Sequence, residues 1–185
     1  MAVLCLAEVA SGAVAMDATA KAVSASAQLG DVTVLVCGPA TAADEAAKID
    51  GVTKVLVADD AAYANGLAEN LAALIVSLAG DYTHITAPAT TTGKNVLPRV
   101  AALLDVMILT DVTSVVDADT FTRPIYAGNA IQTVRSKDEK KVITFRTSTF
   151  EAAGLSGAAA VSDISGAEDA GLSQFVEDKV AVNDR

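Results

Sequence analysis

Short apolar runs alternate with Ala-rich helical patterns along the first 110 residues, and this rhythm limits the fold more than any other feature. Near-continuous apolar runs are typical of strands buried on both faces of a parallel sheet. Helices between such strands cover the sheet on both sides. We therefore expect a three-layer, mostly parallel α/β fold. The predicted strands span residues 2–9, 31–37, 54–58, 82–87 and 106–110, and the predicted helices span residues 17–29, 41–49 and 65–78, with a fourth helical pattern from Val96 to Leu104.

The rhythm breaks after about residue 110, where strand-like segments follow one another without intervening helical patterns. We interpret them as an added antiparallel meander that extends one edge of the sheet or projects as an arm. Its strands are predicted at residues 121–126, 130–135 and 141–146, with Ile125, Ile131, Val134, Val142 and Phe145 as inward-facing candidates.

The last part of the chain changes character again. We predict an α/β domain over residues 1–150 and a flexible linker over 151–167, which is rich in Ala, Gly and Ser and has no periodicity. A short helix is predicted over 168–185, because the apolar spacing from Leu172 to Val182 is helical. A linker and a small helix at this place suggest that a further domain follows.

Charge and apolar content exclude several classes of protein. The 23 acidic and 13 basic residues give a net charge of −10, which disfavours binding to nucleic acid or anionic lipid. No apolar run approaches the roughly 18–20 residues of a membrane span, so we expect no membrane insertion. Cys5 and Cys37 lie in apolar strand-like runs and are interpreted as buried, reduced thiols. These features favour the cytoplasm or an equivalent reducing compartment.

A polar loop between the predicted strand 82–87 and the fourth helical pattern has the geometry at which open α/β sheets bind ligands. Pro88 stands where a phosphate-binding loop of the Walker type would have its first Gly, and Asn95 follows the Gly-Lys pair. No GxGxxG motif follows the first strand either. The loop is therefore interpreted as a vestigial nucleotide loop. Its residues are Thr90, Thr91, Thr92, Gly93 and Lys94.

The remaining polar residues do not form a recognisable catalytic set. His84 is the only histidine and lies inside an apolar strand, where a structural role is the simpler interpretation. There is no GxSxG motif and no spacing typical of metal ligands. We assign no catalytic residue and no metal site. Lys94 and Arg99 could bind an anion, or could make interface or solvent salt bridges.

The predicted meander contains one unusual cluster. A basic residue, an aromatic residue and a Gly-Asn turn lie within a few positions, which is uncommon on a purely solvated edge. We interpret the cluster as a protein interface or domain contact, with a plain structural turn as the open alternative. The candidate interface residues are Arg123, Tyr126, Gly128 and Asn129.

The segment TFTRPIYAGNAIQTV, residues 120–134, closely resembles the α subunit of electron transfer flavoproteins. The surrounding run from Pro98 to Gly154, the segments AVLCLAEV and GDVTVLVCG, and APATTTGKNVLPRVAALL resemble the first domain of the same subunit. The resemblance covers essentially the whole chain. It implies a Rossmann-like fold with an adenine-nucleotide-hydrolase-like topology.

The resemblance also implies a function. Proteins of this family are αβ heterodimers that carry electrons from acyl-CoA dehydrogenases of fatty acid β-oxidation, and from other dehydrogenases, to a membrane quinone oxidoreductase. FAD is held mostly by a second domain of the α subunit, so FAD contacts are expected beyond Arg185. AMP is bound by the partner β subunit. We expect no cofactor on this chain alone and an electron-carrier role rather than an enzyme activity, in the bacterial cytoplasm or the mitochondrial matrix. The alternative is a stand-alone adenine-nucleotide-binding module that uses residues 90–94.

Overall fold

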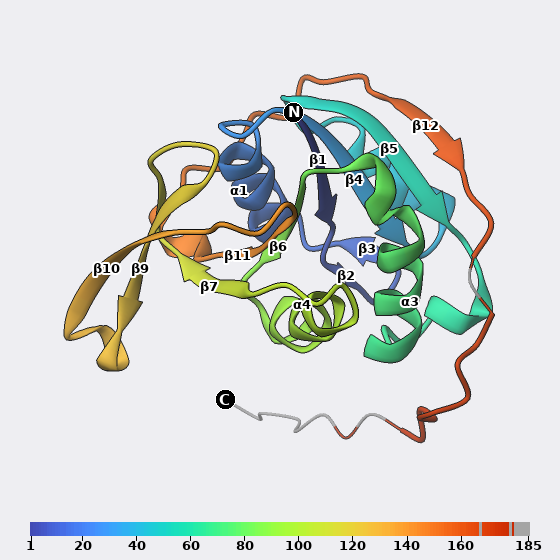
Figure 1. Ribbon diagram of the computed structural model, residues 1–185. Helices are drawn as coiled ribbons and strands as arrows, with labels where there is room; N and C mark the ends of the chain where they lie inside the picture. Colours follow the sequence, from blue (N-terminus) through green and yellow to red (C-terminus); the bar gives the residue numbers. More distant parts are fainter. Residues whose placement is uncertain (167, 178, 180–185) are drawn as a thin grey trace, which may run out of the picture.

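A seven-stranded sheet forms the centre of the computed structural model, which describes residues 1–166, 168–177 and 179 (Figure 1). Its strand order is β12-β5-β4-β1-β6-β11-β7, and every pairing in it is parallel. This confirms the predicted mostly parallel α/β sheet. The strands are β1 (Ala2–Leu6), β4 (Asp31–Cys37), β5 (Val52–Ala58), β6 (His84–Pro88), β7 (Ile108–Val112), β11 (Lys141–Phe145) and β12 (Ala160–Asp163).

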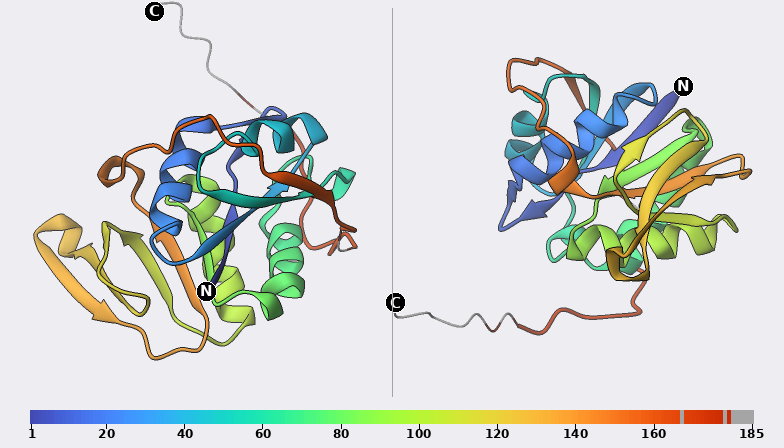
Figure 2. Two further views of the ribbon diagram at one scale, coloured as in Figure 1. Left: turned by 90° about the horizontal axis from the view of Figure 1, so that it is seen from above. Right: turned by 90° about the vertical axis from the view of Figure 1, so that its left-hand side faces the viewer.

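Helices cover both faces of this sheet, as Figures 1 and 2 show. One buried cluster joins helices α3 and α4 to one face, and a second joins α1 and α2 to the other. Small side chains such as Ala22, Ala43 and Ala72 are fully buried, so the helices lie close to the sheet. The α-helices are α1 (Met16–Ser26), α2 (Ala40–Ala46), α3 (Ala68–Leu78) and α4 (Thr91–Leu103), and the 3₁₀ turns are η1 (Ala61–Tyr63), η2 (Ala79–Asp81), η3 (Tyr126–Gly128) and η4 (Thr147–Thr149).

Two small antiparallel sheets flank the central one. β2 (Val9–Ala10) pairs with β3 (Ala13–Val14) directly after β1. β8 (Ser114–Val115), β9 (Thr120–Ile125) and β10 (Ala130–Arg135) form a three-stranded sheet in the order β10-β9-β8. The β9–β10 hairpin projects away from the body of the domain as an arm (Figures 1 and 2).

The third predicted strand of the meander belongs elsewhere. β11 does not pair with β10; it lies between β6 and β7 in the parallel sheet. Residues 142–145 are all buried, which is the pattern of a central parallel strand rather than of an alternating meander strand. The arm prediction therefore holds for β9 and β10 and is wrong for residues 141–146. Of the predicted inward residues, Val142 and Phe145 are fully buried and Ile131 is exposed.

The segment after residue 150 packs on the domain where a flexible linker was predicted. Asp50 donates its backbone N–H to Gly154 O, and Gly157 and Ala159 donate theirs to the loop after α2. A Cβ on Gly157 would lie 2.9 Å from the carbonyl oxygen of Ile49, so the small residues permit close backbone contact. These contacts, rather than the composition, show that the segment packs closely.

The rest of this segment also differs from the prediction. β12 lies inside residues 151–167 and covers the edge of β5. Residues 168–177 contain no helix, so the predicted helix is absent from that range. The remainder of the predicted helix, apart from residue 179, lies outside the described residues.

Candidate functional site

The first turn of α4 occupies most of the predicted polar loop. The helix begins at Thr91, directly after the N-cap Thr90, whose Oγ1 accepts the N–H of Gly93 at 3.2 Å. A Cβ on Gly93 would lie 2.1 Å from the carbonyl oxygen of Pro88, so glycine is required where this turn meets the end of β6. The sequence correctly placed these residues between a strand and a helix, but they are helical from Thr91 onward.

A carboxylate of the chain itself faces this helix N-terminus. Glu8 follows β1, and its Oε2 accepts a hydrogen bond from Thr90 Oγ1 at 2.6 Å while its Oε1 accepts one from Thr92 Oγ1 at 2.9 Å. The backbone of Glu8 is also fixed, because its N–H donates to Thr19 Oγ1 and its carbonyl accepts from Ala15 N–H. The N-terminus of a helix is where an α/β sheet commonly holds a phosphate. Here that position has an internal anion.

A cavity of about 460 Å³ adjoins the same end of the sheet. It lies where β1 and β4 end, and the loop after η1 closes one side. Among the described residues, no Lys, Arg or His side chain lines it, so this lining offers no cation to neutralise a phosphate. Its lining consists of Leu6, Ala7, Val9, Ser11, Gly12, Cys37, Gly38, Pro39, Tyr63, Ala64, Asn65, Gly66, Leu71, Thr92 and Phe175.

The end of β7 brings together two cations that were predicted separately. Lys94 Nζ lies 3.0 Å from Asp111 Oδ1, and Arg123 Nη2 donates to Thr110 Oγ1 at 2.6 Å. Asp111 has a positive φ of 54°, so the backbone is strained where these side chains meet. Lys94 is therefore paired, and its salt bridge supports the structural alternative over an anion site.

Arg123 has a donor that nothing in the described chain accepts. Its Nε is buried and has no hydrogen-bond partner there, a property shared with Arg99 Nε. Arginine cannot lose its charge in a protein, so a buried, unsatisfied guanidinium N–H is costly. Such a donor requires an acceptor, and a water molecule would serve as well as a carbonyl group of a partner.

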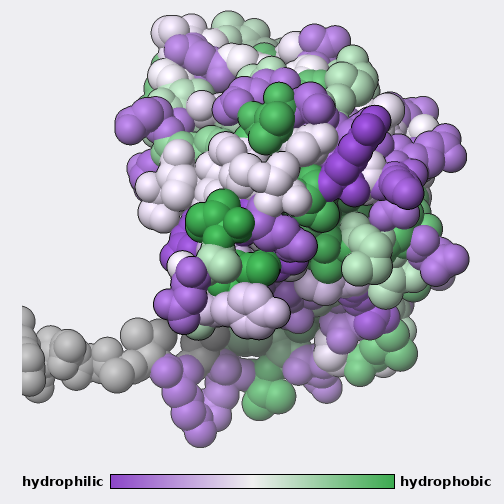
Figure 3. Space-filling view, turned by 60° about the vertical axis from the view of Figure 1, so that its left-hand side comes forward, coloured by the Kyte–Doolittle hydropathy of each residue, from purple (hydrophilic) through white to green (hydrophobic). Residues whose placement is uncertain are grey.

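The tip of the arm is strained and exposed. Tyr126, Ala127 and Gly128 have consecutive φ values of 50°, 54° and 89°. Tyr126 is 79% exposed, an unusual state for an aromatic side chain, and Asn129 is exposed beside it. Figure 3 shows this side of the molecule, where hydrophobic and hydrophilic residues are interspersed. Backbone strain at an exposed aromatic tip is typical of a surface that contacts another molecule.

A family model and several known proteins that resemble this chain all point to the same family. The family model for the electron transfer flavoprotein domain matches residues 3–169. The chain belongs to the electron transfer flavoprotein family. It is 65% identical to the electron transfer flavoprotein subunit alpha of Paracoccus denitrificans and 53% identical to that of Pseudomonas aeruginosa, in each case over 100% of this chain and 61% of the relative. It is 44% identical, over 78% of this chain and 44% of the relative, to the mitochondrial subunit alpha of Dictyostelium discoideum. The chain thus spans about 61% of the length of the first two of these relatives.

In the described residues of this electron transfer flavoprotein chain, the N-terminus of α4 is poorly suited to a flavin dinucleotide. A pyrophosphate at α4 would meet the Glu8 carboxylate, and the adjoining cavity offers no cationic side chain. No step of flavin chemistry is therefore assigned to these residues. The same arrangement disfavours AMP at residues 90–94.

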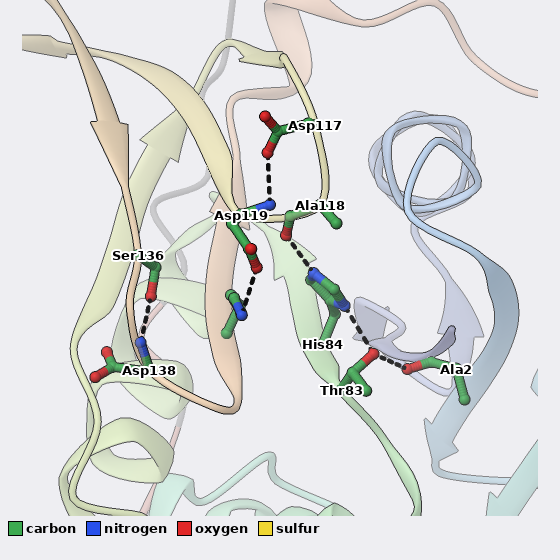
Figure 4. Close-up of polar contacts among 9 residues, drawn as sticks. Ala2, Thr83, His84, Asp117, Ala118, Asp119, Ser136 and Asp138 are labelled. Carbon is green, nitrogen blue, oxygen red and sulfur yellow. Dashed lines mark hydrogen bonds and ion pairs between the residues drawn. The ribbon is translucent and has the colours of Figure 1, made fainter.

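His84 has a structural environment (Figure 4). The side chain is 1% exposed, with Nε2 2.8 Å from Ala118 O and Nδ1 2.9 Å from Thr83 Oγ1. Burial lowers the pKa of His84, and the neighbouring Lys141 lowers it further, while the hydrogen bond to Ala118 and the charge of Asp119 act in the opposite direction. A buried imidazole held at both nitrogens joins β6 to the loop before β9.

Among the described residues no three His, Cys, Asp or Glu side chains are grouped so that they could hold a metal ion. Over the same part of the chain, no helix has the length and apolar character needed to cross a bilayer.

Three residues that shape the N-terminus of α4 and the cavity were not predicted from the sequence. Glu8 was absorbed into the predicted strand 2–9, although a lone carboxylate at the end of an apolar run is a recognisable signal. Asn70 is buried in the first turn of α3, and Phe175 lines the cavity from the segment after β12. Nothing in the local sequence distinguishes these two, because their contacts join residues about 100 positions apart.

Proposed function

We propose that this chain is the scaffold domain of an electron transfer flavoprotein α subunit, which packs against a β subunit. The observation that carries the proposal is the family match over residues 3–169. The named relatives are α subunits, and that name implies a β partner. Within the αβ heterodimer, FAD would be held mainly outside this chain, with AMP in the β subunit.

The role we propose is electron carriage without a catalytic site in this chain. The assembled protein would accept electrons from acyl-CoA and other dehydrogenases and deliver them to a membrane quinone oxidoreductase. The flavin supplies the redox chemistry when bound, and the protein supplies orientation and electrostatics. We place the protein in the bacterial cytoplasm, or in the mitochondrial matrix in eukaryotes, as the names of the eukaryotic relatives suggest.

The arm is the surface we propose for subunit contact. Arg123 offers an unsatisfied Nε at its base, and the strained turn presents Tyr126 at its tip, beside Gly128 and Asn129. Tyr and Arg are the residue types that most often dominate interface energies. The hairpin projects from the domain (Figure 1), and Tyr126 at its tip is exposed, so this side chain can reach a partner without unfolding of the domain.

Co-purification with the cognate β subunit tests this role. We expect the chain to form a complex detectable by size-exclusion chromatography, and Arg123→Ala to weaken it at least about tenfold because a buried charged contact is lost. Arg135→Ala is the matched control, since Arg135 lies on the same hairpin and is exposed. Absence of any complex at low and high ionic strength would refute the scaffold role, and equal effects of the two variants would refute the role of Arg123.

A further inference from the structure

The segment after β12 runs across the carboxyl ends of the central strands and is held at several separate points. We call residues 164–166 and 168–175 the strap. Ile164 donates its N–H to Val57 O at 2.9 Å and packs against the core beneath α3. Gly166 lies against the ring of Tyr63, where an added Cβ would be 2.9 Å from Cε2. Ser173 Oγ donates to Glu69 Oε2 at 2.9 Å.

Asn70 is the main anchor of the strap. Its side chain is only 1% exposed, and its Nδ2 donates to Asp169 Oδ1 at 3.1 Å while its Oδ1 accepts from Ala170 N–H at 2.9 Å. The same Nδ2 also donates to Ala62 O at 3.0 Å. Two of these three bonds go to the strap. A buried amide without partners is costly, so the docked strap is the arrangement that satisfies Asn70.

Beyond this anchor, one of the apolar side chains lines the cavity. Phe175 is 40% exposed and lines the cavity of about 460 Å³, whereas Leu172 and Val176 are 68% and 84% exposed. The cavity lining has no ionisable cation and includes Leu6 and Leu71, so a neutral aromatic ring suits it. The chain supplies such a ring itself.

We propose that the strap is a built-in lid, anchored at Asn70, which closes the carboxyl-end cavity with Phe175. The lid goes beyond the proposed scaffold role and does not depend on it. Opening the lid requires release of the contacts that the strap makes with Asn70 and Glu69. It does not require release of the β12 pairing, because the strap residues in these contacts all follow residue 163. The lid can therefore open while the sheet stays intact.

The two cysteines report on the lid independently. Cys37 lines the cavity, whereas Cys5 is fully buried in the centre of the sheet and is outside the cavity lining. Burial raises the pKa of Cys37 to about 12 and that of Cys5 to about 11, and two hydrogen bonds to Cys5 act in the opposite direction. Both thiols therefore react slowly in the closed state. Lid opening exposes Cys37, and only unfolding of the sheet exposes Cys5.

Labelling the full chain with N-ethylmaleimide, followed by quantification of each cysteine peptide by mass spectrometry, tests the lid. We expect Asn70→Ala to raise the labelling rate of Cys37 about tenfold or more, because two hydrogen bonds to the strap are lost. Cys5 labelling should change less than about twofold. The amide of Ala170 should also exchange hydrogen faster in this variant.

A second variant avoids the risk that loss of a buried amide unfolds the domain. Phe175→Ala should raise Cys37 labelling several-fold, and Val176→Ala is the neighbouring control that should leave it unchanged. The lid is refuted if Cys37 labelling is unaffected in both test variants. It is equally refuted if Cys5 and Cys37 accelerate together, or if Cys37 in the original chain reacts as fast as in urea.

Discussion

Removing the Glu8 carboxylate should destabilise the domain, because this side chain stabilises the N-terminus of α4. Hydrogen bonds to a charged group contribute about 1.5–3 kcal/mol each, and a negative charge at a helix N-terminus adds about 0.3–1 kcal/mol. Glu8, Thr90 and Thr92 are half-buried, so water replaces part of this interaction in the variant. We therefore expect Glu8→Ala to lower the free energy of unfolding by about 2 kcal/mol. Glu8→Gln keeps an acceptor but loses the charge, and should cost about 1 kcal/mol.

Urea unfolding followed by far-ultraviolet circular dichroism measures these changes. Glu139→Ala is the control, since Glu139 is an exposed carboxylate in the turn before β11 and should change stability by less than about 0.5 kcal/mol. If Glu8→Ala costs no more than the control, the carboxylate does not stabilise α4. Titration with AMP gives a second check, because saturable micromolar binding to the unaltered chain would show that a phosphate can displace Glu8.

Three further changes test other parts of the fold. Gly93→Ala should lower the free energy of unfolding by about 3 kcal/mol, because the new Cβ would overlap Pro88 O; in urea unfolding, Gly80→Ala, whose Cβ would meet nothing within 4 Å, should be nearly neutral. Ala127→Gly should stabilise by about 0.5–1 kcal/mol, because it removes left-handed strain of about 1–2 kcal/mol and loses part of that gain to unfolded-chain entropy; a loss of stability in the same assay would contradict it. Burial lowers the pKa of His84, so the unfolded chain binds the proton more readily and the free energy of unfolding should fall as the pH drops below about 6.5. His84→Gln should flatten this dependence below about pH 6.5, and parallel curves for the two proteins would contradict the assignment.

Most of the parallel sheet was predictable because β1, β4, β5, β6 and β7 each carry their own sequence signal. Residues 31–37 and 54–58, for example, are short apolar runs bounded by turn residues. Several such runs in one chain are typical of a parallel sheet whose strands are buried on both faces. The position of β11 was not predictable from alternation, since burial on both faces comes from its neighbours β6 and β7. The segment 151–163 was missed for a related reason. Its small residues permit close backbone packing as readily as flexibility, and only the tertiary contacts distinguish the two.

In the candidate site, too, local sequence patterns could be predicted and tertiary contacts could not. Thr90 to Lys94 were located correctly because a strand, a Pro and a helix pattern bracket them. Motif comparison could say that a phosphate-binding loop is absent, but it could not say what lies at the helix N-terminus instead. That information resides in Glu8, which is 82 residues from Thr90 and reaches it only because β1 and β6 are neighbours.

Stability and assembly consequently lie at different places in this electron transfer flavoprotein domain. At the carboxyl ends of the strands, Glu8 occupies the N-terminus of α4 and Phe175 lines the cavity. Substitutions there should act on unfolding or on lid opening. The arm is the opposite case, because its strained tip and the unsatisfied Arg123 Nε stabilise nothing within the described chain. Strain at the exposed tip costs the isolated domain free energy, so substitutions at the tip should change assembly while leaving the free energy of unfolding unchanged or improved.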